Sequence, residues 1–75
     1  GLYGLKRALL KAGAQNIITS LWKVDDEATM MFMTNFYSHL AETQNLAEAF
    51  HEAMITLQAK YPQPYYWGAF ILTQN

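Results

Sequence analysis

Three consecutive carboxylates, Asp25, Asp26 and Glu27, form the densest group of titratable side chains in the sequence. Such a group can hold a metal ion for hydrolysis, or it can open a helix, because carboxylates cap free N–H groups and favour the positive end of the helix dipole. The helix explanation accounts for all three residues, so we expect no metal and no other cofactor. We expect His39 and His51 inside helices, as surface or boundary residues without a catalytic role.

The absence of cysteine restricts the chemistry further. None of the 75 residues can form a disulfide, a thiolate nucleophile or a cysteine-type metal site. The net charge is −1 and the five Lys and Arg residues form no basic stripe, so nucleic-acid binding has no electrostatic support. No apolar run approaches the roughly 20 residues of a membrane span, and no signal peptide is recognisable. We therefore expect a cytoplasmic protein that binds neither nucleic acid nor membrane.

The helices and strands that would position these residues form, by prediction, an α/β fold in the order α-β-α-α-β. Apolar residues recur at helical spacing over about 2–12, 26–41 and 45–58, which predicts three helices. Short apolar runs over about 17–22 and 66–73, rich in β-branched or aromatic residues, predict two strands. Residues 1–75 are enough for one small domain and too few for two.

Local signals support the boundaries of these elements. Gly13 is suited to end the first helix, and Asp25 is suited to cap the second. Asn45 followed by Glu48 is a capping box, which predicts the start of the third helix. The sequence Tyr-Pro-Gln-Pro at 61–64 predicts a helix end and an extended turn before the last strand.

The side chains that we expect to face the sheet and form the core are Phe36, Phe50 and Leu57. Met31 and Met33 are expected to pack in the core, and Met30 is the methionine of that cluster most exposed to solvent. Tyr65, Tyr66 and Trp67 are expected to anchor the last strand against the third helix. An aromatic platform for a ligand or a proline-rich peptide is the alternative for these three residues.

Two strands alone do not make a stable sheet in water, so the predicted fold is incomplete by itself. Six stretches then carry a specific resemblance, namely residues 4–10 (GLKRALL), 12–14 (AGA), 18–22 (ITSLW), 24–29 (VDDEAT), 36–40 (FYSHL) and 64–70 (PYYWGAF). In this order they resemble the C-terminal half of CHAT domains, which are similar to separases and caspases. The resemblance covers nearly the whole chain.

The resemblance implies a caspase-like cysteine peptidase whose His/Cys dyad lies upstream of this segment. The strand at 17–22 would be the last of a parallel set, and the strand at 66–73 would lie antiparallel to it at the sheet edge. Because the dyad needs a thiolate activated by an imidazole, we expect this chain to have no peptidase activity of its own. It would contribute sheet framework and one wall of the specificity pocket to a parent that is a cysteine endopeptidase.

The resemblance also implies two site residues. Separases have a similar Leu-Trp-x-Val-x-Asp stretch, and its last residue matches Asp26, which would receive a basic side chain of the substrate. Trp22 would be a wall of the same pocket. A carboxylate beyond the carboxyl end of a strand is where open α/β sheets bind ligands, and it can pair bidentately with arginine. Helix capping is the alternative role for Asp25 and Asp26.

The expected partners are the upstream half of the parent peptidase domain and a peptide or protein substrate. Strand 17–22 has no Pro and no charge, so its open edge predicts a homo-oligomer, most simply a two-fold dimer. The competing hypothesis is a stand-alone, non-catalytic interaction or assembly module with the same architecture.

Overall fold

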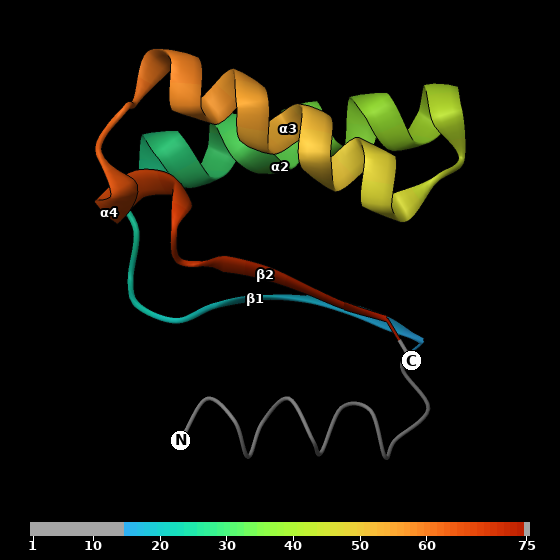
Figure 1. Ribbon diagram of the computed structural model, residues 1–75, viewed down its shortest axis with the longest axis horizontal. Helices are drawn as coiled ribbons and strands as arrows, with labels where there is room; N and C mark the ends of the chain where they lie inside the picture. Colours follow the sequence, from blue (N-terminus) through green and yellow to red (C-terminus); the bar gives the residue numbers. More distant parts are fainter. Residues whose placement is uncertain (1–14, 75) are drawn as a thin grey trace.

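The computed structural model describes residues 15–74, which form a two-stranded sheet with helices on one side (Figure 1). The helix expected over 2–12 lies outside the described residues. In chain order the elements are β1 (Asn16–Ser20), α2 (Asp26–Thr43), α3 (Leu46–Lys60), α4 (Pro64–Trp67) and β2 (Phe70–Gln74).

The two strands pair antiparallel, which confirms the expected relation between them. The register places Asn16 opposite Gln74 and Ser20 opposite Phe70. Strand β1 ends two residues earlier than expected, because the chain bends at Leu21 and Trp22 and exposes both side chains. A final backbone hydrogen bond of 2.9 Å, from the Leu21 N–H to the Ala69 carbonyl oxygen, closes this end of the hairpin.

The expected boundary of the last strand, at residue 66, is wrong. Residues Pro64–Trp67 form the short helix α4 rather than an extended turn and a strand, and β2 begins only at Phe70. Proline is favoured at the first helical position, because its fixed φ suits a helix and its missing N–H would have no helical partner there. The high strand propensity of the aromatic residues that follow is overridden by this local helical start.

The two long helices begin where the capping signals predict. The Asp25 carboxylate accepts a hydrogen bond of 3.1 Å from the Ala28 N–H at the start of α2. The Asn45 side-chain oxygen accepts one of 3.0 Å from the Glu48 N–H at the start of α3. Both helices run two residues further than expected, to Thr43 and Lys60.

Helices α2 and α3 pack together and cover one face of the sheet (Figure 1). Successive strand residues point to opposite faces, so Ile18 on β1 and its partner Leu72 on β2 face the same way. Ile18 packs against the core that the two helices form. Ile18 and Phe70 therefore connect the sheet to the helices.

Phe32 on α2 is the centre of the core. Its side chain is fully buried, and its ring stacks on Phe70 of β2 with centroids 4.4 Å apart and planes inclined by 6°. The ring of Phe50 on α3 meets Phe32 edge-on at 5.4 Å. One side chain thus links both long helices to the sheet.

The core expectations hold in most respects. Phe36 and Leu57 are buried, while Phe50 is half-buried and packs against the core. Met31 and Met33 also pack against it, whereas Met30 is 70% exposed. In the described part of the chain, no helix is long and apolar enough to cross a membrane.

Candidate functional site

The loop between β1 and α2, residues 21–25, carries Trp22 and leads directly to Asp26. The loop has no regular secondary structure, and Val24 is its one buried residue. Trp22 is 41% exposed. Its side chain is nevertheless held in place, because the indole Nε1–H donates a hydrogen bond of 2.9 Å to the Tyr65 carbonyl oxygen.

Tyr65 of α4 returns a second hydrogen bond to the same loop. Its hydroxyl donates to the Lys23 carbonyl oxygen at 2.9 Å, and its ring stacks on Trp22 with centroids 6.4 Å apart. The Ser20 hydroxyl also donates to the Trp22 carbonyl oxygen. The end of β1 and the loop are therefore fixed to α4, which lies more than 40 residues away in sequence.

Gly68 allows this close approach. A Cβ atom there would lie 2.8 Å from the Pro64 carbonyl oxygen, a separation that side chains essentially never show, and 3.7 Å from the Trp22 ring. The Gly68 N–H donates a hydrogen bond of 2.7 Å to that same Pro64 oxygen. The tight turn after α4 therefore needs glycine at this position.

The two neighbouring aspartates occupy different positions. Asp25 precedes α2 and caps it, whereas Asp26 is the first residue of the helix and is exposed. Asp25 is therefore the residue that caps α2. The carboxylate of Asp26 lies in the first turn, where the helix dipole favours a negative charge.

The acidic residues do not gather into a metal site in the described range 15–74, where no group of three or more His, Cys, Asp and Glu side chains is placed to hold an ion. His39 is half-buried on α2, and His51 is exposed on α3. The two histidines lie on different helices and form no cluster with Asp25, Asp26 and Glu27.

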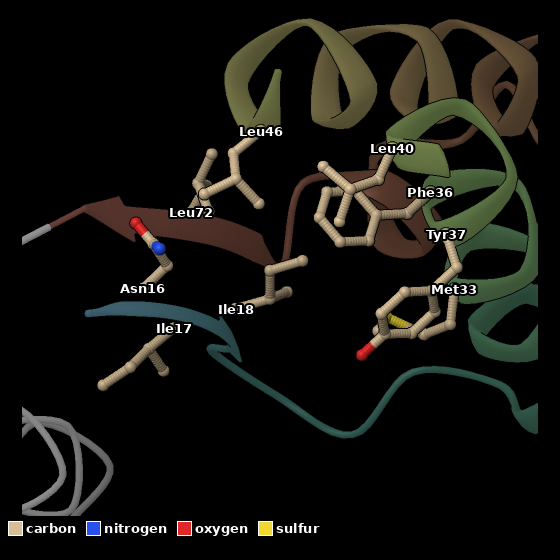
Figure 2. A pocket seen from close by; sticks show the side chains of 9 residues that line it. All are labelled: Asn16, Ile17, Ile18, Met33, Phe36, Tyr37, Leu40, Leu46 and Leu72. Carbon is tan, nitrogen blue, oxygen red and sulfur yellow. The ribbon is translucent and has the colours of Figure 1, made fainter. Parts of the chain in front are cut away.

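A second feature is an apolar pocket of about 260 Å³ between the sheet and the helices. Three residues of β1 line the pocket but only one residue of β2 does, so the pocket lies on the β1 side of the sheet. Figure 2 shows Ile18 pointing from β1 toward the side chains of α2. Its lining comprises Asn16, Ile17, Ile18, Met33, Phe36, Tyr37, Leu40, Leu46 and Leu72.

The edge of β1 beside this pocket is open within residues 15–74, where β1 pairs with β2 alone. Tyr37 lines the pocket and is 61% exposed. An edge strand presents a row of backbone N–H and C=O groups that can pair with another strand. The edge of β1 and the pocket therefore form one continuous surface, in which the strand offers backbone hydrogen-bonding groups and the pocket offers apolar side chains.

The sequence singles out Trp22 and Asp26 as candidate pocket residues, but it gives no sign of the contact between Trp22 and Tyr65. Residues 65–67 were expected to anchor the last strand against the third helix, but they lie in α4, before that strand begins. Tyr66 packs on Tyr61 at 4.6 Å, and the Trp67 Nε1–H donates to the Pro62 carbonyl oxygen at 3.1 Å. No local signal distinguishes Tyr65, because its contact is made across 43 residues.

The family model of the CHAT domain matches residues 1–75, and the chain belongs to this family. The CHAT family is a caspase-like peptidase family, and the small α/β arrangement of helices and antiparallel strands is consistent with a part of such a fold. The chain is similar to Tetratricopeptide repeat protein 28 of Homo sapiens, with 39% identity over 74 residues. The protein of the same name from Mus musculus is 38% identical over 74 residues.

These matches cover 96% of the chain but 3% of each relative, so the chain spans a small part of the length of the curated relatives. No solved structure matches the chain.

Proposed function

We propose that this chain is the non-catalytic C-terminal segment of a CHAT-type cysteine peptidase domain. It supplies sheet framework and part of the pocket that selects the substrate. A cysteine peptidase needs a thiolate nucleophile, and none of these 75 residues is cysteine. The nucleophile and its histidine therefore come from the upstream half of the domain, in the cytoplasm, where thiols stay reduced.

The observation that carries the framework role is the open edge of β1 beside the apolar pocket. Residues 16–20 include no charged residue and no proline, the two devices that proteins use to keep an edge strand from pairing. The upstream half of the domain would add a strand along this edge. An apolar side chain of that half would fill the pocket between Ile18, Met33 and Tyr37.

The pocket role concerns the other end of β1. Trp22 and Asp26 follow the carboxyl end of the strand, the edge at which open α/β sheets bind ligands. Asp25 already caps α2, so the Asp26 carboxylate is not needed for that purpose. It would pair with a basic side chain of a peptide or protein substrate, with Trp22 as the adjoining wall.

A binding experiment tests the framework role. The upstream half and this chain are expressed as separate polypeptides, and their complex is captured through a tag on one of them. Tyr37→Arg places a charge at the rim of the pocket and should abolish the complex. Ile55→Arg is the matched control, because Ile55 is 46% exposed and lines no part of the pocket, so that variant should bind normally. Equal binding by both variants would contradict the proposed surface.

A second candidate is a non-catalytic interaction or assembly module. The relatives are named for tetratricopeptide repeats, which stack into superhelices with extended binding surfaces. Large apolar side chains are also exposed along the described part of this chain, namely Leu21, Trp22, Met30, Tyr37, Ile55 and Tyr65.

A thiol-directed peptide electrophile separates the two candidates in the natural-length protein. Covalent labelling of one upstream cysteine that depends on an upstream histidine supports the peptidase. The absence of any such labelling supports the interaction module.

A further inference from the structure

The loop that carries Trp22 has few contacts that could fix its shape. Between the end of β1 and the start of α2, four of the five residues are exposed, and Val24 alone enters the core. A loop with so little buried surface is expected to open more readily than the elements beside it. The contacts that do hold it therefore decide where its side chains lie.

Two hydrogen bonds of Tyr65 add to the restraint from the Leu21–Ala69 and Ser20–Trp22 hydrogen bonds, and they alone connect the loop to α4 among the hydrogen bonds of residues 15–74. Its carbonyl oxygen accepts from the Trp22 indole, and its hydroxyl donates to the Lys23 carbonyl oxygen, each at 2.9 Å. One bond fixes the Trp22 side chain and the other fixes the loop backbone one residue further on. A single residue of α4 thus holds both parts of the loop.

Ring contacts support the same arrangement. The Trp22 and Tyr65 rings are inclined by 27° and stack with centroids 6.4 Å apart. The turn at Gly68 brings α4 close enough for a Cβ atom there to touch the Trp22 ring. Helix α4 is in turn packed against α3, so the restraint is anchored in the body of the domain.

The hydrogen bonds also determine what the ring pair can offer to a ligand. The indole N–H and the tyrosine hydroxyl both donate within the chain. The two residues nevertheless stay accessible to solvent, with Trp22 41% and Tyr65 50% exposed. Aromatic faces without free donors suit a planar cation, and guanidinium stacks on them better than ammonium does.

We propose that Tyr65 is a positioning residue for the substrate pocket, which holds Trp22 and the loop 21–25 so that an arginine side chain can stack on the Trp22–Tyr65 pair. The arginine part of this inference rests on the pocket role proposed above for Trp22 and Asp26. The positioning part depends on contacts within the chain alone.

Hydrogen–deuterium exchange in the natural-length protein tests the positioning part. Tyr65→Phe removes the hydrogen bond to Lys23 and leaves the ring in place. Segment 20–28 contains two bonded reporters, the Leu21 and Ala28 N–H groups. Its exchange should rise about fivefold, the factor expected for one lost hydrogen bond, while segment 46–60 of α3 stays unchanged.

Tyr66→Phe is the matched control, because it removes a hydroxyl from the next residue of α4 without touching the Trp22 loop. It should leave exchange in segment 20–28 as it is. If Tyr65→Phe did not raise exchange in segment 20–28, the positioning role would be overturned. An equal rise in segment 46–60 would overturn it as well, because the substitution would then loosen the whole domain rather than the Trp22 loop.

Peptide binding provides the second readout, with an arginine-containing tetrapeptide amide and its lysine counterpart as probes. The unaltered protein should prefer arginine, and Tyr65→Phe should reduce that preference by up to about fivefold, because affinity falls with the fraction of molecules whose loop is closed. A rise in exchange without any arginine preference in the unaltered protein would leave the positioning role standing and refute the proposed pocket. Preserved preference despite the rise in exchange would refute the link between the two.

Discussion

Replacement of Phe32 by alanine should remove much of the stability of this domain. Phe32 is fully buried and contacts α3 through Phe50 and the sheet through Phe70. Truncation of a buried phenylalanine costs about 3–5 kcal/mol, because apolar burial is lost and a cavity is left. The stacked ring of Phe70 places Phe32 toward the upper end of that range, since aromatic pairs add about 0.5–1.5 kcal/mol.

That loss of stability is large compared with the total free energy of unfolding expected for this chain. A chain of 75 residues is expected to have a free energy of unfolding of roughly 4–11 kcal/mol. Phe32→Ala should therefore leave a marginal or unfolded chain at 25 °C, whereas Phe32→Leu, which keeps part of the volume, should lose about 1–2 kcal/mol.

Urea denaturation followed by circular dichroism, at one fixed protein concentration, measures these differences. Met30→Ala is the control on the same helix, because Met30 is 70% exposed and its truncation should change stability by less than about 0.5 kcal/mol. If Phe32→Ala unfolded at the same urea concentration as Met30→Ala, the assignment of Phe32 to the centre of the core would be refuted.

Two further predictions concern catalysis and specificity. The purified chain should cleave no peptide substrate, since it has no cysteine, and thiol-dependent cleavage by a verified pure preparation would contradict this. In a natural-length protein that cleaves after basic residues, Asp26→Asn should reduce kcat/KM for arginine substrates about tenfold or more. Asp25→Asn should weaken that cleavage far less, because an asparagine oxygen can still accept the capping hydrogen bond from the Ala28 N–H. Equal effects of the two changes on cleavage would point to capping alone.

The parts of the fold that the sequence predicted well have local causes. The starts of α2 and α3 follow from Asp25 and Asn45, whose side chains bond to backbone N–H groups three residues away. Such caps are readable from sequence because donor and acceptor are neighbours along the chain. The helix ends are less well marked, and both were placed two residues too early.

The features that the sequence did not predict depend on competing local preferences or on contacts between residues far apart in the chain. Aromatic residues 65–67 have high strand propensity, yet Pro64 starts a helical turn through them. The apolar arc of α2 is so wide that its periodicity did not single out Phe32 as the central residue. The contact of Trp22 with Tyr65 spans 43 residues, and the pocket joins β1 to α2 and α3, so neither has a local signature.

The mass of the chain in solution, alone and with the upstream half of the domain, tests the central claim most directly. Alone, the open edge of β1 should pair with its own copy and give a dimer of twice the 8.6 kDa chain mass. Because the upstream half would occupy the same edge, its addition should replace the dimer by a complex with one copy of each. A chain that remains monomeric by light scattering at micromolar concentration and does not bind the upstream half would contradict the account.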